Sequence, residues 1–156
     1  MQASAFDTTA PTFERHRALP DGVREAIRAA ILDAIDVPFP RLLDLGAGTG
    51  RIGAAFAAAG DDYVGVDLSF PMLCEFAQRG SARLVQADGA RLPFADANFD
   101  AVMLIQVFGG MRRWREVLAE GRRVLRPAGA LLVGRTVAPR RRDRRANEAA
   151  PRRDPG

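Results

Sequence analysis

Apolar residues along the chain follow two spacings, one typical of helices and the other of buried strands. From Pro20 onward, apolar side chains recur at helical spacing, at Val23, Ile27, Ala30, Ile31, Ala34 and Ile35. This pattern predicts an amphipathic helix that begins near Pro20 and ends before Pro38. Three further helices are predicted, one in an Ala-rich stretch that ends near Gly60, one over about 70–79 and one over 111–125.

Short, continuously apolar runs lie between the predicted helices and predict five strands, at 41–45, 63–66, 82–86, 99–107 and 130–137. Strands that are apolar along their whole length and alternate with helices imply a parallel sheet covered on both faces. The predicted fold class is therefore α/β, a doubly wound, Rossmann-like parallel sheet. Right-handed crossovers predict the strand order 3-2-1-4-5, with the ligand crevice at the carboxyl ends of strands 1 and 4.

Composition and charge divide the chain of 156 residues into three parts, of which only one is predicted to form a packed domain. Residues 1–19 are a polar lead or lid segment, 20–138 the core domain and 139–156 a disordered Arg- and Pro-rich tail. The net charge of +4 arises in the tail, which has 7 Arg against 3 acidic residues, whereas residues 1–138 have 16 of each. A basic nucleic-acid-binding face is therefore not expected on the core.

Several kinds of chemistry are excluded because their residues are missing. Cys74 is the only cysteine and His16 the only histidine, so disulfide frameworks, Cys/His zinc sites and Ser-His-Asp or Cys-His triads cannot form within the core. No metal site is expected. The apolar runs fall well short of the ~20 residues that a membrane-spanning helix needs, and no signal-like run begins the chain. A cytoplasmic protein without membrane contact is therefore expected.

The candidate chemistry begins at a glycine-rich loop, in which Gly46, Gly48 and Gly50 follow a strand and precede a helix. Such a loop lets a ligand lie against the backbone, and free N–H groups at the helix start suit an anion. A dinucleotide also fits, since Asp67 lies 19 residues after Gly48. The carboxylate of Asp44 would repel a pyrophosphate but attract an ammonium group. It favours an amino-acid-like cofactor.

Five elements in order resemble the class I S-adenosylmethionine-dependent methyltransferase family between about Arg41 and Gly134. They are Asp44-x-Gly46-x-Gly48-x-Gly50, Asp67-Leu68-Ser69-x-x-Met72-Leu73, Gln86-Ala87-Asp88-Gly89-Ala90-x-Leu92-Pro93-Phe94, Phe99-Asp100-Ala101-Val102 and Leu125-Arg126-Pro127-x-Gly129. The resemblance implies an S-adenosylmethionine site formed by Asp44, Gly46, Ala47, Gly48, Gly50, Asp67, Leu68, Met72, Asp88, Gly89, Ala90, Gln106 and Arg17.

The resemblance also implies a role for each part of this site. Asp44 would face the ammonium group of the methionine portion, and Asp67 would accept both ribose hydroxyls. The adenine would lie between Leu68 and Met72, with Asp88 accepting a hydrogen bond from its amine and Gly89 or Ala90 donating a backbone N–H. Gln106 and Phe108 would line the methyl-transfer pocket, and Arg17 would belong to a lead segment that folds over the cofactor. No catalytic residue is identified.

The implied function is methyl transfer from S-adenosylmethionine to a small-molecule acceptor. Because the methyl group is already activated, positioning supplies most of the acceleration, and a protein base is not required. Nucleic-acid bases are disfavoured as acceptors, because 104–110 lacks the Asn-Pro-Pro-aromatic type of motif. Three alternatives stay open: a truncated domain that binds the cofactor without turnover, an NAD-binding Rossmann module and an RNA-binding tail, which has no aromatic residue for stacking.

The C-terminal part departs from the resemblance, since the apolar pattern stops near Val137. The family normally continues into an antiparallel hairpin that completes the sheet, so a truncated or frameshifted relative without this hairpin is expected. The fifth strand would then be an apolar sheet edge protected only by Arg135, and self-association through this edge is expected.

Overall fold

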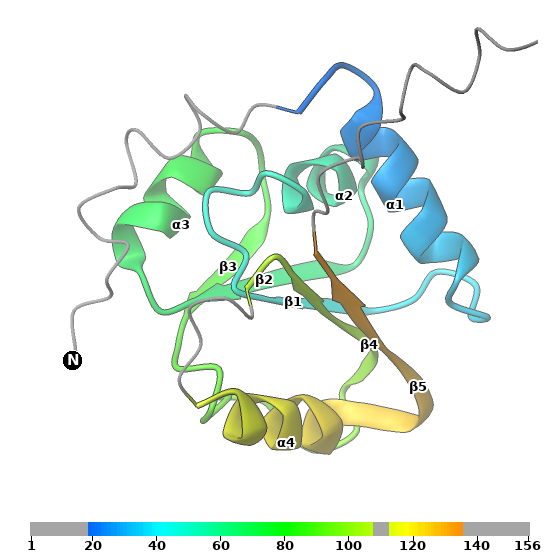
Figure 1. Cartoon of the computed structure of the whole chain (residues 1–156), viewed down its shortest axis with the longest axis vertical. Helices are drawn as coiled ribbons and strands as arrows, with labels where there is room; N and C mark the ends of the chain where they lie inside the picture. Colours follow the sequence, from blue (N-terminus) through cyan, green and yellow to red (C-terminus); the bar gives the residue numbers. More distant parts are fainter. Residues whose placement is uncertain (1–18, 108–112, 136–156) are drawn as a thin grey trace, which may run out of the picture.

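The computed structural model describes residues 19–107 and 113–135, which form one sheet with helices on both faces (Figure 1). The helices are α1 (Val23–Asp33), α2 (Gly53–Ala59), α3 (Phe70–Ala77) and α4 (Trp114–Val124). The strands are β1 (Leu42–Leu45), β2 (Tyr63–Asp67), β3 (Arg83–Gln86), β4 (Phe99–Ile105) and β5 (Leu125–Gly134). Each predicted helix and strand is found, with ends that differ by a few residues.

The five strands pair in the order β3-β2-β1-β4-β5, and every pair is parallel. The predicted fold class and strand order are therefore confirmed. In the centre, Leu43 of β1 lies opposite Val64 of β2 on one side and Val102 of β4 on the other. Because all strands run the same way, their carboxyl ends share one edge of the sheet, where a doubly wound fold binds its ligand.

Two apolar layers hold helices against the two faces of the sheet. One layer contains Ile31 of α1, Phe56 of α2 and Phe76 of α3 and lies on the face that these three helices cover (Figure 1). The opposite layer contains Val117 and Val124 of α4. Alternate strand residues supply the two layers, as expected for a sheet buried on both sides. Among the described helices, none has the length and apolarity needed to cross a membrane.

The fifth strand begins earlier than the sequence predicts, at Leu125 rather than Ala130. α4 passes directly into β5, and the last turn of the helix is tied to the preceding loop, because the backbone N–H groups of Ala97 and Asn98 donate to carbonyls of that turn. Pro127 cannot continue a helix. The pairing with β4 shifts register between Phe99 and Ala101, and Ala128 adopts a positive φ of 64° in this irregular stretch.

β5 is an edge strand of the sheet formed by the described residues, and its side chains are unevenly covered. Ala130 and Leu132 pack against the face of α1, α2 and α3. Leu131 and Val133 point to the other face and are 42% and 58% exposed. Apolar edge strands pair readily with other chains. Self-association of this chain through β5 therefore stays a prediction.

Replacing Val133 by Lys should lower any self-association of the 156-residue chain, because a charge on an exposed edge strand opposes strand pairing. Light scattering over a range of concentrations measures the change. A matched change of exposed Phe70 to Lys, on α3 away from β5, should leave association as in the wild type. Equal association of the wild type and Val133→Lys would exclude this edge as the contact.

Candidate functional site

The glycine loop after β1 requires glycine at two positions for different contacts with the protein. Gly46 has a φ of 81°, and a Cβ there would lie 2.3 Å from Cγ1 of Val107. Gly50 has a φ of 77°, and its Cβ would lie 2.3 Å from the ring of Phe76. Gly48 differs, because a Cβ there would meet only the Gly46 carbonyl oxygen, at 3.9 Å. The surface over Gly48 is therefore open, and a ligand can lie against it.

Asp67, at the end of β2, holds the glycine loop against the neighbouring strand. Its Oδ2 accepts a hydrogen bond of 2.8 Å from the backbone N–H of Gly48, and its Oδ1 accepts one of 2.8 Å from that of Ser69. Both carboxylate oxygens therefore accept backbone hydrogen bonds at the carboxyl end of β2. Asp67 is thus placed to shape the loop.

Asp44 lies inside β1 and is 4% exposed, an unusual environment for a carboxylate. The phenol of Tyr63 donates a hydrogen bond of 2.7 Å to its Oδ2. Burial raises the pKa of Asp44 to about 6, the hydrogen bond from Tyr63 opposes this rise, and the negative charge of Asp67 adds to it. At pH 7 the group is mostly ionised, and a cationic partner would stabilise it further.

Asp88 lies in the loop between β3 and β4 and is held from two sides. Its Oδ1 accepts a hydrogen bond of 2.9 Å from the Ala90 backbone N–H. Its Oδ2 accepts one of 2.9 Å from Nη1 of Arg113, at the start of α4. Both side chains of this ion pair are about half exposed. The carboxylate is therefore oriented while it stays accessible from solvent.

Gln106 follows β4 in a backbone conformation that residues other than glycine rarely adopt, with a φ of 64°. Its backbone N–H donates to the Gly134 carbonyl at 2.7 Å, which keeps it aligned with β5. Its side-chain Oε1 accepts a hydrogen bond of 3.0 Å from Nη1 of Arg51, next to the glycine loop. This contact joins the carboxyl ends of β1 and β4, where the predicted crevice lies.

The remaining predicted site residues differ in accessibility. Leu68 is 40% exposed, whereas Met72 of α3 is only 3% exposed. Gly89 has room beside it, because a Cβ there would stay 3.5 Å from Val117. Arg17 and Phe108 lie outside the described residues, so their roles stay predictions. Within residues 19–107 and 113–135, no group of three His, Cys, Asp or Glu is placed to hold a metal ion.

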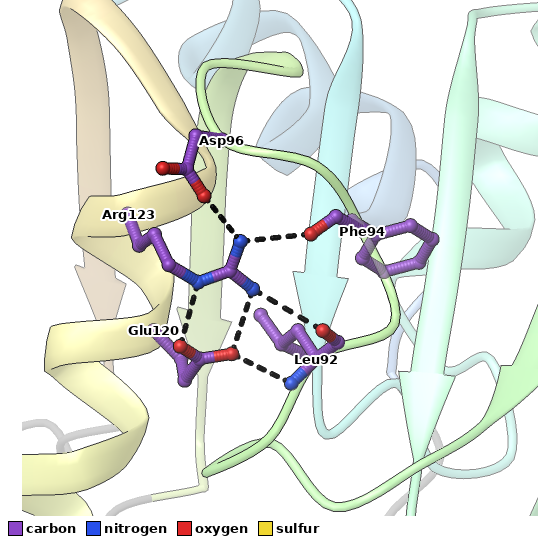
Figure 2. Close-up of polar contacts among 5 residues, drawn as sticks. All are labelled: Leu92, Phe94, Asp96, Glu120 and Arg123. Atoms are coloured by element: carbon purple, nitrogen blue, oxygen red, sulfur yellow. Dashed lines mark hydrogen bonds and ion pairs between the residues drawn. The ribbon is translucent and has the colours of Figure 1, made fainter.

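A second arginine, Arg123, fixes the loop that carries Asp88 to the C-terminal half of α4. Arg123 donates hydrogen bonds to the Leu92 and Phe94 carbonyls at 3.2 and 2.8 Å, and it contacts Asp96 and Glu120 at 2.7 Å (Figure 2). Glu120 in turn accepts a hydrogen bond of 2.7 Å from the Leu92 backbone N–H. The pair therefore satisfies three backbone groups of a loop that has no regular structure of its own.

Three contacts at the site were not found from the sequence. Tyr63 reaches Asp44, Arg113 reaches Asp88, and Arg51 reaches Gln106. These partners are 19, 25 and 55 residues apart, and no local spacing pairs them. Parallel register brings β1 beside β2, but which side chains bridge the strands depends on ring and guanidinium length.

Residues 43–133 match the model of a family described as "Methyltransferase domain". The chain belongs to this family. The match covers β1 to β5 and includes all the predicted site residues except Arg17. The predicted family resemblance is therefore confirmed over the part of the chain that carries the glycine loop and the three site carboxylates.

A curated relative, demethylmenaquinone methyltransferase of Renibacterium salmoninarum, is 36% identical over 134 residues. The alignment covers 84% of this chain and 56% of that protein, so the chain spans just over half the length of this methyltransferase relative. A solved structure described as a possible histamine N-methyltransferase of Thermotoga maritima shares the fold with a TM-score of 0.64 and 23% identity. The structural alignment covers 82% of this chain and 58% of the Thermotoga maritima chain.

The same fold also occurs in a protein described as a [4+2]-cyclase, SpnF, with a TM-score of 0.65 and 24% identity. The alignment covers 81% of this chain and 57% of that chain. These structural likenesses show the fold of the methyltransferase domain. They do not by themselves identify the reaction, which has to be argued from the site.

Replacing Arg123 by Met should lower the free energy of unfolding by about 2 to 3 kcal/mol, because two loop carbonyls and Glu120 lose their partner. Arg126→Met removes a more exposed arginine, which pairs with Asp100 but reaches no loop carbonyl in the described residues, and should cost about 1 kcal/mol or less. Urea denaturation at pH 7 measures both. Equal losses would contradict a specific role of Arg123 in fixing the loop.

The stabilisation by this pair should also depend on pH. The hydrogen bonds and charge of Arg123, together with the Leu92 backbone N–H, lower the pKa of Glu120 from 4.5 to about 2 in the folded protein, and Arg123 is the larger cause. A depressed folded pKa stabilises the protein above the unfolded pKa, and this stabilisation disappears as the carboxylate is protonated. The difference between the wild type and Arg123→Met should therefore shrink as the pH falls from about 4.5 to 2.

Proposed function

We propose that this methyltransferase domain binds S-adenosylmethionine and transfers its methyl group to a small-molecule acceptor. The observation that carries the proposal is the buried Asp44 carboxylate beside an open glycine loop. A carboxylate that is 4% exposed and mostly ionised at pH 7 is costly unless a cation approaches it. The ammonium group of an amino-acid-like cofactor is such a cation, and it reaches this position if the cofactor lies over Gly48.

The groups around the glycine loop fit the parts of this cofactor. The open surface over Gly48 leaves room for the methionine portion, because a Cβ there would have no side-chain neighbour within 4 Å. Asp67, at the end of β2, would accept hydrogen bonds from the ribose hydroxyls with its two carboxylate oxygens. Asp88 is oriented by Ala90 and Arg113 to accept a hydrogen bond from an amine.

When bound, S-adenosylmethionine supplies a methyl group on a sulfonium sulfur, which is already activated for displacement. The protein then has to hold the cofactor and the acceptor in line and to exclude water. Asp44 would hold the ammonium group of the methionine portion, and Asp67 would hold the ribose hydroxyls. Gln106, at the switch between β1 and β4, lies where an acceptor can approach, and Arg51 fixes its side chain.

The acceptor is a small molecule in this proposal, and the relatives' name suggests a chemical class. The curated relative described above and a second one, from Beutenbergia cavernae, are both named demethylmenaquinone methyltransferase. This name makes a quinone-type acceptor the first one to assay. The alignment covers just over half of those proteins. The acceptor is therefore proposed from likeness, whereas the cofactor is proposed from the site itself.

An NAD-binding module is the main competing proposal, because Asp67 and the glycines also suit a dinucleotide. The burial of Asp44 argues against it. A pyrophosphate placed on the glycine loop would bring two negative charges near an ionised and poorly solvated carboxylate, which like-charge repulsion disfavours.

S-adenosylhomocysteine should stabilise the purified chain, and NAD should not. Ligand at 100 times its dissociation constant adds about 2.7 kcal/mol to the free energy of unfolding. A thermal-shift series with both ligands at equal concentrations measures this. A rise of the melting midpoint with NAD and none with S-adenosylhomocysteine would contradict the proposed function.

Asp67→Asn should weaken S-adenosylhomocysteine binding more than Asp88→Asn, because it weakens two charge-assisted hydrogen bonds to hydroxyls rather than one to an amine. The expected loss is on the order of 1.5 to 3 kcal/mol for each charged hydrogen bond. Isothermal calorimetry gives both affinities, and melting of the ligand-free variants shows whether the glycine loop is intact. A larger effect at Asp88 would reverse the proposed orientation of the cofactor.

A further inference from the structure

Tyr63 is the only tyrosine of the chain, and its hydroxyl lies deep in the core beside a carboxylate. The residue begins β2 and is 2% exposed. Its ring stacks on Phe56 with centroids 5.7 Å apart and meets Phe76 at 6.1 Å. A phenylalanine would provide the same stacking without burying a hydroxyl, which costs free energy unless it is hydrogen-bonded. The hydroxyl therefore needs its own explanation.

The partner of this hydroxyl is Asp44, at 2.7 Å. Gly53 leaves the space that the contact requires. A Cβ there would lie 2.0 Å from the phenol oxygen and 2.9 Å from the ring of Phe76. Gly53 is helical and has no positive φ, so the backbone conformation does not require glycine there. Glycine at this position is explained by the room that the phenol and, to a lesser degree, the Phe76 ring occupy.

Two ionisable groups in the described part of the chain act on the charge of Asp44. Tyr63 favours the ionised carboxylate by donating to it, whereas Asp67 opposes it with a like charge. Burial raises the pKa of Tyr63 well above its ordinary value, and the charge of Asp44 and their hydrogen bond add to this rise. The phenol therefore keeps its proton at neutral pH and stays a donor.

We propose that Tyr63 is a positioning residue, whose phenol fixes the Asp44 carboxylate in its ionised form so that it can receive the ammonium group of the cofactor. This inference rests on the proposed function. Tyr63 does not touch the cofactor in this arrangement; it acts through Asp44. A cation bound by Asp44 requires an ionised carboxylate, so cofactor affinity should fall when the pH drops through the pKa of Asp44, at about 6.

Tyr63→Phe should move this loss of affinity to higher pH. Removing a donor to the ionised carboxylate raises the pKa of Asp44, by about one unit for one hydrogen bond to a charged group. Affinity for S-adenosylhomocysteine, measured by calorimetry between pH 5.5 and 8.5, should stay near the wild-type value at pH 8.5. At pH 6 it should be about fivefold weaker, as follows from a one-unit shift of the titration.

A second variant disturbs the hydrogen bond between Tyr63 and Asp44 without removing the hydroxyl. Gly53→Ala places a Cβ where the phenol oxygen lies and should reproduce the shift of the pH profile. Gly121→Ala on α4 is its control, because a Cβ there would keep an ordinary distance of 3.5 Å from Val102. Phe56→Leu is the control for packing, since it weakens the stacked cluster but leaves the hydroxyl on Asp44. Both controls should keep the wild-type midpoint.

The outcomes separate this inference from the proposed function. If the wild type fails to bind S-adenosylhomocysteine at every pH, the proposed function is wrong, and this role of Tyr63 is wrong with it. If the wild type binds and Tyr63→Phe keeps the same pH midpoint, only the inference is wrong. Carbon NMR titration of the Asp44 carboxyl in the ligand-free proteins should show the same upward shift, and an unshifted titration would likewise overturn the role of Tyr63.

Discussion

A carboxylate buried in the middle of an apolar sheet is the constraint around which this site is organised. Asp44 belongs to the central strand β1, between β2 and β4, where water cannot stabilise its charge. Neighbouring side chains partly offset the free energy cost of burying this charge. Tyr63 provides a donor, and Gly53 leaves room for its phenol group. Among the described residues, no cation acts on the charge of Asp44, and the glycine loop begins two residues later in the chain.

The part of the candidate site around Asp88 is positioned in a different way, because Asp88 lies in a loop without regular structure. α4 holds this loop at both ends of the helix. Arg113 contacts it near the start of α4, and Arg123 and Glu120 contact it near the end (Figure 2). α4 also packs Val117 against the sheet. The helix that follows β4 therefore positions a loop that precedes it, and the Asp88 side of the candidate site is fixed by tertiary contacts rather than by the loop's own residues.

The sequence predicts the architecture well because its signals are local. The spacing of apolar residues and the glycines between elements predict each helix and strand. The right-handedness of crossover connections predicts the strand order, which the structure confirms. The predicted start of β5 is wrong because Leu125 directly follows the helical pattern. The hydrogen bonds that end the helix come from the backbone N–H groups of Ala97 and Asn98, in a loop far away in the sequence. The bridge from Tyr63 to Asp44 escaped prediction for the same reason. It depends on where a ring lies between two strands and a helix, and residue spacing does not encode that.

The fold alone leaves the reaction undetermined, since structures described as a methyltransferase and as a cyclase superpose on this chain about equally well. The discrimination has to come from charges at the strand ends. A dinucleotide site needs an acidic residue at the end of β2 and an unopposed positive field at the glycine loop. This chain has the first in Asp67, but a second carboxylate, the buried Asp44, lies in β1 two residues before the loop and close enough to Asp67 for the two charges to interact. A ligand with a cationic group near the loop and a ribose near β2 satisfies both carboxylates at once, and an aminoacyl nucleoside such as S-adenosylmethionine has this distribution of groups.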